Sequence, residues 1–301
     1  MKCAVIYFSL TGNTKKVSEH IYEGVLAANR QCDLLNLKDV SIMKLKEYDL
    51  VGIGTPVWGF AEAEPVRIFQ QAVPAAPGQH WFMFATHCAD RGSVFYHMAK
   101  ALRLKGAAVI ASRSWYGEMW MPQYPKPYPT DGHPDKTDLA EAFDYGKQAV
   151  SRSQRIAAGE IDLIPEEFGR ARERLHVANI PMRLNMEKCV FPKCRLCEKK
   201  CPMGAINFIS KPPLFRHPGR CVNCLLCEII CPHGAIEADY AEEAVRARGT
   251  VIQGVTQLME KATAKGYLRQ LVPWSDIDVD TPMYRTSKWG KHPRILFSRL
   301  P

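Results

Sequence analysis

Several features are missing from this sequence of 301 residues. It contains no run of about 18 apolar residues, so we predict no membrane-spanning helix. The apolar stretch after Lys2 is short and no cleavage site follows it, so we expect no signal peptide. No G-x-G-x-x-G motif follows an apolar run, which argues against direct binding of a nicotinamide dinucleotide. These absences predict a cytoplasmic protein without a membrane segment.

The positive charge of the chain is unevenly spread. The formal net charge is +9, and residues 161–301 carry 22 Lys and Arg against 15 Asp and Glu. No known nucleic-acid motif accompanies these scattered charges, so we do not expect nucleic acid as a partner. The excess fits better with docking of an acidic protein, or with balancing the charge of a bound cofactor.

Cysteine is concentrated in one part of the chain. Eight of the 11 cysteines form two runs, Cys189-x4-Cys194-x2-Cys197-x3-Cys201-Pro202 and Cys221-x2-Cys224-x2-Cys227-x3-Cys231-Pro232. The second run has the bacterial [4Fe–4S] spacing, in which the fourth cysteine ligates the other cluster. Crossing the fourth ligands predicts two clusters. One would be held by Cys189, Cys194, Cys197 and Cys231, the other by Cys221, Cys224, Cys227 and Cys201.

Two other interpretations of the cysteines are open. Structural zinc also uses C-x-x-C pairs, but it does not account for two runs of four that each end in Cys-Pro. A disulfide framework would not be expected to crowd eight cysteines into 43 residues of a chain without a signal peptide. Thiolates for clusters require a reducing compartment, which again predicts the cytoplasm.

The cysteine region resembles the two-cluster bacterial ferredoxins over about residues 186–240. The repeated Cys-Pro-x-Gly-Ala-Ile at 201–206 and 231–236 indicates an internal duplication. The sequence departs from this family once, because the first gap is x4 with Phe191 and Pro192 inside it, where the family has x2. That departure concerns only Cys189 as a ligand.

The N-terminal half alternates apolar runs with helical patterns. Strands are predicted at residues 3–8, 32–37, 49–54, 80–85 and 107–115, with helices between them. Continuous apolar runs such as residues 3–8 are typical of strands that are buried on both faces of a parallel sheet. The pattern therefore predicts an α/β domain with ligands bound at the carboxyl ends of the strands.

Polar and glycine-bearing loops follow three of these strands. Residues 9–14 (SLTGNT) stand between a strand and a helix, where backbone N–H groups and hydroxyls can bind a phosphate without lysine. An ordinary capped turn is the alternative, since Ser, Thr and Asn also cap helices. Trp58, between Pro56 and Gly59, is expected at the ligand edge, where it can stack on a flat ring; a core tryptophan is the alternative.

This half resembles the flavodoxin family over about residues 1–158. The resemblance implies a doubly wound five-stranded parallel sheet of order 2-1-3-4-5 that binds FMN. The third loop matches least well, because it carries His87, Cys88 and Arg91 in place of an aromatic and acidic stretch. We interpret Cys88 as a packed thiol. The implied FMN-binding residues are Ser9, Leu10, Thr11, Gly12, Asn13, Thr14, Thr55, Pro56, Val57, Trp58, Gly59, Thr86, His87, Cys88 and Gly92.

Four segments are predicted along the chain. Residues 1–158 form the flavodoxin-like domain, with an aromatic insertion at 116–134 that we expect beside the flavin. Residues 159–185 form a basic linker, partly helical over 166–175. Residues 186–240 form a small α+β ferredoxin-like domain with two [4Fe-4S] clusters. Residues 241–301 form an irregular C-terminal extension, with a helix over 242–266 and an ordered tail.

The whole chain resembles flavodoxin–ferredoxin fusion proteins, which implies electron transfer between FMN and two [4Fe-4S] clusters. A protein redox partner is expected as the electron donor. One hypothesis, which we favour, is an oxidoreductase that reduces a small-molecule substrate at the flavin. The other is a pure electron carrier that docks to a protein acceptor. A redox sensor has no positive support. A homodimer is also expected, with flavin and cluster juxtaposed across the subunits.

Overall fold

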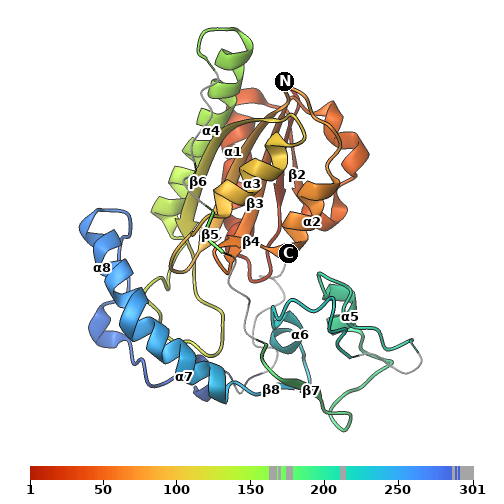
Figure 1. Ribbon diagram of the computed structural model, residues 1–301, viewed down its shortest axis with the longest axis vertical. Helices are drawn as coiled ribbons and strands as arrows, with labels where there is room; N and C mark the ends of the chain where they lie inside the picture. Colours follow the sequence, from red (N-terminus) through yellow and green to blue (C-terminus); the bar gives the residue numbers. More distant parts are fainter. Residues whose placement is uncertain are drawn as a thin grey trace. The chain divides into compact units, whose positions relative to one another are not determined.

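The computed structural model describes residues 1–162, 168, 171–173, 179–210, 215–286, 289 and 291. The chain forms two compact units (Figure 1). The first comprises Met1–Glu118 with Gly132–Leu175, and the second comprises Met119–Asp131 with His176–Leu300. The chain therefore passes between the units more than once.

The first unit is built on a parallel sheet of order β2-β1-β3-β5-β6. This confirms the predicted order, because β4 is only a two-residue strand that pairs antiparallel with β3. Every other pairing along the sheet is parallel, which requires a crossover connection between paired strands. The strands are β1 Cys3–Tyr7, β2 Cys32–Asn36, β3 Leu50–Trp58, β4 Ala61–Glu62, β5 His80–His87 and β6 Ala108–Tyr116.

Helices cover both faces of this sheet. The helices are α1 Asn13–Asn29, α2 Glu64–Ala72, α3 Val94–Arg103 and α4 Lys136–Ala157, with short 3-10 turns at Leu37–Asp39 and Ile42–Glu47. Successive residues of a strand point to opposite faces, so Ile6 joins the core beneath α2 and α3, whereas Val5 joins the core beneath α1 and α4. This explains why β1 is apolar throughout.

The second unit contains the two cysteine runs. Its antiparallel strands β7 Met182–Leu184 and β8 Ile236–Ala238 pair with each other. Short helices α5 Leu196–Lys200 and α6 Leu226–Ile229 lie within the two runs. A longer helical stretch follows as α7 Ala241–Thr250, a π-helical turn Val251–Val255 and α8 Thr256–Ala264, and two 3-10 turns come after it at Trp274–Asp276 and Met283–Arg285. The predicted C-terminal helix thus continues past Gly254 by means of the π turn.

The aromatic insertion belongs to the second unit over residues 119–131, although it was predicted within domain 1–158. Its backbone pairs with the tail: Met283 N donates to Tyr124 O at 2.8 Å, and Tyr284 N donates to Pro122 O at 3.0 Å. Backbone pairing between segments so far apart in sequence leaves no local signal. The tail prediction agrees with the buried side chains of Met283 and Trp289, while most residues after 286 lie outside the described part.

The predicted linker also contains structure. Strand β7, Met182–Leu184, lies within the predicted linker 159–185 and pairs with β8. The β-sheet of the second unit therefore begins before residue 186. Phe168 packs beside Phe95 of α3, at 6.3 Å between ring centroids. The helix predicted over 166–175 falls mostly outside the described residues.

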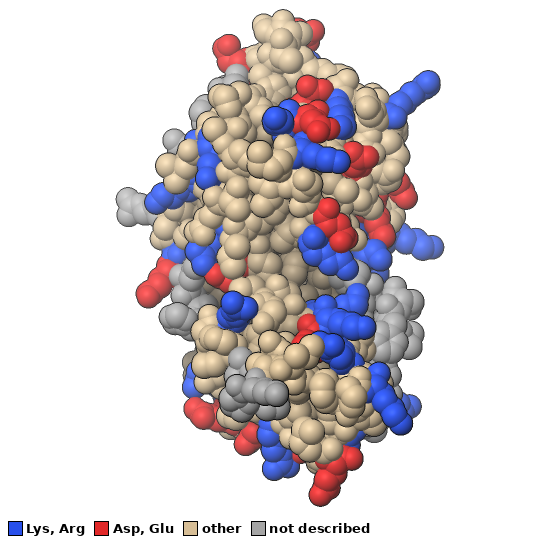
Figure 2. Space-filling model, turned by 90° about the vertical axis from the view of Figure 1, so that its right-hand side faces the viewer, with Lys and Arg blue, Asp and Glu red and all other residues tan. Residues whose placement is uncertain are grey.

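No helix in the described part of the chain has both the length and the apolar character needed to cross a bilayer. On the face shown in Figure 2, Lys and Arg side chains are interspersed with Asp and Glu. The net charge of +9 is therefore not gathered into one continuous field on that face.

Candidate functional site

The predicted phosphate loop leads directly from β1 into α1. Gly12, with φ of 99°, precedes the first helical residue, and no described side chain caps the helix. Ser9 Oγ instead accepts a hydrogen bond from Gly12 N at 3.2 Å, which folds the loop back on itself. The Ser9 hydroxyl thus stabilises the turn that leads into α1 and makes no hydrogen bond with the N–H groups of the helix itself. The first N–H groups of α1 are left for an anion, which the positive end of the helix dipole favours.

Two side chains of this loop connect it to neighbouring segments. Thr14 and Thr86 are both buried, and their hydroxyls share a hydrogen bond of 2.8 Å. Asn13 Nδ2 donates to Glu118 O at 3.1 Å, just beyond the end of β6. The loops after β1 and β5 and the segment after β6 consequently meet at one edge of the sheet.

The segment predicted as the second loop is partly a strand. β3 continues to Trp58 because Val57 and Trp58 pair with Glu62 and Ala61 of β4. Gly59 and Phe60 form the two-residue turn and both have positive φ, 54° and 68°, as a type I′ hairpin requires. The prediction of a loop over residues 55–59 is therefore corrected to a strand end and hairpin.

Trp58 lies at the end of this hairpin strand. Its ring meets Phe8 edge-on, with 5.8 Å between centroids and 81° between planes. The side chain is half-buried against the core and keeps part of its surface open to solvent. This position is intermediate between a core tryptophan and a fully exposed one, and it leaves surface for contact with a ring-shaped ligand.

The hairpin turn packs tightly on the loop after β5. A Cβ atom at Gly92 would lie 2.4 Å from Phe60 Cβ, and the φ of Gly92 is +57°. Ser93 N donates to Phe60 O at 2.9 Å. Only glycine permits this approach, so the predicted second and third loops are held together as one surface.

Arg172 adds a contact that the sequence alone did not identify. Its guanidinium pairs with Asp90 Oδ2 at 2.5 Å and lies 5.7 Å from the centroid of the Phe60 ring. Its backbone N also donates to Ser93 Oγ at 3.1 Å. The basic composition of the predicted linker was a signal, but it did not indicate which residue returns to the loops.

His87 ends β5 and is buried. Its Nδ1 lies 3.0 Å from Ala89 O, so this nitrogen carries the proton and donates. Its ring lies 4.5 Å from the ring of Tyr116 at the end of β6. Burial lowers the pKa of His87 to about 4, so the imidazole is neutral at neutral pH. Burial likewise raises the pKa of Tyr116.

Beyond Tyr116, three polar side chains gather at the start of α4. His133 Nδ1 lies 2.5 Å from Asp138 Oδ2, and Asp135 and Asp138 form a capping box. Their closeness resembles a metal site, but the capping interactions of α4 account for it.

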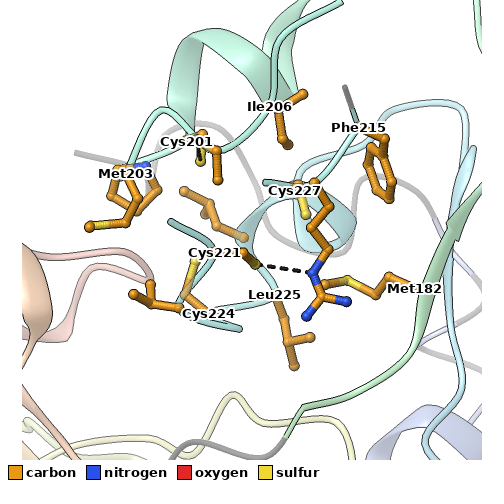
Figure 3. A pocket seen from close by; sticks show the side chains of 14 residues that line it. Met182, Cys201, Met203, Ile206, Phe215, Cys221, Cys224, Leu225 and Cys227 are labelled. Carbon is orange, nitrogen blue, oxygen red and sulfur yellow. Dashed lines mark hydrogen bonds between the residues drawn. The ribbon is translucent and has the colours of Figure 1, made fainter. Parts of the chain in front are cut away.

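Four of the eight motif cysteines line one cavity of the second unit. Cys221, Cys224 and Cys227 come from the second run, and Cys201 comes from the end of the first run (Figure 3). Apolar neighbours including Met182, Ile206 and Leu225 surround them. The structure thus brings together the four thiols that were predicted to share one cluster.

The other four cysteines are also neighbours. Cys231, Cys189 and Cys194 are close enough to Cys197 to raise the pKa of its thiol, after the larger effect of burial. The two Cys-Pro repeats have matching geometry, because Ala205 N donates to Cys201 Sγ at 3.2 Å and Ala235 N donates to Cys231 Sγ at 3.3 Å. The duplication seen in the sequence is therefore present in the fold.

The longer first gap is occupied by a turn. Lys193 N donates to Val190 O at 2.9 Å, and the Phe191 ring lies 5.0 Å from the Phe208 ring. Cys189 N donates to Asn185 O at 3.1 Å, just as Cys221 N donates to His217 O at 2.9 Å in the second run. The longer gap is thus accommodated by a turn that packs Phe191 on Phe208, while Cys189 makes the same backbone hydrogen bond as its counterpart.

The electrostatics of these thiols fit a metal centre. Burial, followed by neighbouring thiols, raises the pKa of Cys197 to about 11 and of Cys224 to about 12, and the pKa of Cys227 rises well above its usual value. Thiols so crowded stay protonated unless a cation compensates the charge of the thiolates. Metal binding would supply that cation and release the protons.

Comparisons with known proteins find a family match within each unit. A flavodoxin domain family matches residues 4–105, and a 4Fe-4S binding domain family matches residues 215–237. A flavodoxin of Clostridium beijerinckii is 33% identical over 55 residues, which are 18% of this chain. The match spans only 40% of that curated relative.

Solved structures similar to about half of this chain include flavodoxins. A flavodoxin from the domain Archaea is 21% identical with a TM-score of 0.41, covering 51% of this chain and 99% of that one. The two-electron reduced flavodoxin of Megasphaera elsdenii is also 21% identical with a TM-score of 0.41, covering 50% and 98%. The family matches show a flavodoxin-like domain at the N-terminus and a 4Fe-4S binding domain near the C-terminus, as expected of an electron-transfer flavin and iron–sulfur protein.

A pH dependence follows from the buried His87. Because its folded pKa lies below the unfolded value, its neutral form stabilises the fold fully above about pH 6.5, and this contribution is lost as the pH falls toward about 4. The loss amounts to about 3 kcal/mol in order of magnitude. Urea unfolding of the full chain followed by circular dichroism should show it in the wild type and not in His87→Asn. The control His20→Asn, on α1, should behave as the wild type; equal pH slopes in all three proteins would contradict the assignment.

Proposed function

We propose that this electron-transfer protein holds FMN in its first unit and two [4Fe–4S] clusters in its second, and passes electrons between them. The observation that carries the proposal is the cavity in which Cys201 joins Cys221, Cys224 and Cys227. A single run of cysteines cannot supply that set, whereas two interleaved runs can.

The same interleaving supports the second cluster. Cys189, Cys194 and Cys197 would supply three of its ligands, and Cys231 would cross over from the second run. A set of four thiolates could also bind zinc. The match of residues 215–237 to a 4Fe-4S binding domain favours iron for the second run, and the matching backbone geometry extends this choice to the first.

The N-terminal edge of α1 suits the phosphate of FMN. Ser9, Leu10, Thr11, Gly12, Asn13 and Thr14 would surround that phosphate, with the uncapped N–H groups of α1 as donors. The hairpin Thr55–Gly59, with Trp58, would border the flavin ring together with Thr86 and His87 at the end of β5 and Cys88 and Gly92 in the loop after it. The Thr14 hydroxyl bonded to Thr86 holds two of these loops in register.

FMN supplies one- or two-electron redox chemistry when bound, and each cluster supplies one-electron chemistry. The residues of the chain position and insulate these groups. His87 has a neutral imidazole whose Nδ1–H donates to Ala89 O. The packing of Phe60 on Gly92 fixes the distance between the hairpin after β3 and the loop after β5.

We propose a small-molecule substrate as the acceptor, with a redox protein as the electron donor. The insertion supports this choice, because it leaves the FMN edge directly after Glu118 and is held in place by several contacts. Lys126 pairs with Asp131 at 2.7 Å, and Tyr124 packs edge-on against Tyr128 at 5.9 Å. An aromatic segment held by such contacts is suited to binding a small, flat molecule. A carrier for a protein acceptor is the alternative, and the homodimer stays a prediction.

Cluster content tests the first part of the proposal. Anaerobically purified protein should contain about eight iron and about eight sulfide per chain. Cys201→Ser and Cys227→Ser should perturb the same one of two paramagnetic resonance signals, because both ligands belong to one cluster, while Cys231→Ser and Cys197→Ser should perturb the other. Cys32→Ser, outside the runs, is the control and should change neither. About four iron, stoichiometric zinc, or pairing of Cys201 with Cys197 would refute the crossed ligand sets.

Flavin selectivity tests the phosphate loop. Thr11→Ala removes one hydroxyl donor to a charged phosphate, so FMN affinity should fall about tenfold or more, while riboflavin affinity should change less than about twofold. Fluorescence titration of the flavin-free protein measures both constants, and Thr263→Ala, on α8, is the matched control. Equal losses for FMN and riboflavin would show that residues 9–14 do not bind phosphate.

A further inference from the structure

Arg216 lies beside the cavity formed by Cys201, Cys221, Cys224 and Cys227. Its Nε donates to Cys221 Sγ at 3.1 Å (Figure 3). An N–H donor at this distance is within hydrogen-bonding range of a sulfur acceptor, and the donor carries a formal positive charge. One of the proposed cluster ligands is therefore bonded to a cation.

The rest of the guanidinium is held in this orientation by neutral groups. One terminal nitrogen donates to Ile180 O at 3.1 Å, and the other donates to Asn179 Oδ1 at 3.0 Å and to Asn223 Oδ1. These acceptors are amide oxygens, which orient the side chain without neutralising its charge. The half-buried Arg216 is thereby fixed toward the sulfur.

The internal duplication shows that this contact belongs to one half only. His217 N donates to Ala205 O at 2.7 Å, and Asn185 N donates to Ala235 O at 2.7 Å, so His217 and Asn185 occupy equivalent positions. The residue before each is then Arg216 in one half and Leu184 in the other. Leucine has no side-chain donor, so the two cysteine sets are electrostatically unequal at this point.

A charged donor at a cluster thiolate affects oxidised and reduced states differently. Reduction adds one negative charge to a cluster, and a fixed cation bonded to the ligand sulfur stabilises the more negative state. Hydrogen bonds to the sulfurs and nearby net charge are among the factors that set cluster potentials.

We propose that Arg216 is a positioning residue that raises the reduction potential of the cluster held by Cys201, Cys221, Cys224 and Cys227. The inference rests on the proposed ligand sets. If Arg216 raises this potential, an electron shared by the two clusters will reside more often on the cluster ligated by Cys221. Two halves that arose from a repeated motif thus acquire unequal potentials and give electron transfer between them a direction.

The test is an anaerobic redox titration of the full protein monitored by electron paramagnetic resonance. Arg216→Gln should lower one of the two cluster potentials by at least a tenfold change in its reduction equilibrium, about 59 mV for one electron, and leave the other unchanged. Arg216→Lys, which keeps a charge, should recover part of the shift. Arg220→Gln removes an exposed charge adjacent to Cys221 in the chain and is the matched control, expected to shift neither potential appreciably.

The possible outcomes separate this inference from the proposed function. If the wild type lacks two clusters, the ligand sets fail and the inference fails with them. If two clusters are present but Arg216→Gln shifts neither, shifts both alike, or shifts no more than Arg220→Gln, the tuning role is refuted while the ligand sets stand. Loss of a cluster in both Arg216→Gln and Arg216→Lys would likewise refute tuning and make Arg216 a residue needed for assembly.

Discussion

Bringing buried thiols together at a common centre is the constraint on which the second unit depends. The pKa values of the Cys224 and Cys227 thiols are raised because burial and like charges both oppose ionisation, so these two groups need a cation to hold them as thiolates. Around the cysteines, the regular structure in the described residues is limited to the short helices α5 and α6 and the three-residue strands β7 and β8. Under the proposed ligation, bonds to iron would contribute much of the folding energy that this small region cannot obtain from burial alone.

The first unit meets a different requirement, the positioning of several loops at one sheet edge. A parallel sheet covered on both faces places the carboxyl ends of β1, β3, β5 and β6 together. Three contacts then connect segments that are distant in sequence. They are the hydrogen bonds Thr14–Thr86 and Asn13–Glu118 and the packing of Gly92 on Phe60. The sheet therefore determines where the loops of the proposed FMN site lie.

Strand order and the positions of the helices in the first unit could be predicted because they depend on local periodicity, and the duplication of the cysteine motif because it depends on short spacings. Features that depend on long-range pairing could not. The extension of β3 into a hairpin needed β4 as a partner, and residues 119–131 needed the backbone of residues 282–284. Arg172 and Arg216 looked like ordinary basic residues of a linker and a spacer. Only the fold shows that they contact Asp90 and Cys221.

The central claim is that the clusters and the flavin exchange electrons within one protein. The most direct measurement is anaerobic stopped-flow reduction by a one-electron donor, following flavin absorbance in the wild type and in Cys227→Ser reconstituted with FMN. The account predicts a fast phase of flavin bleaching in the wild type whose rate does not depend on protein concentration, and loss of that phase in the variant. Equal rates of flavin bleaching in the two proteins would contradict it.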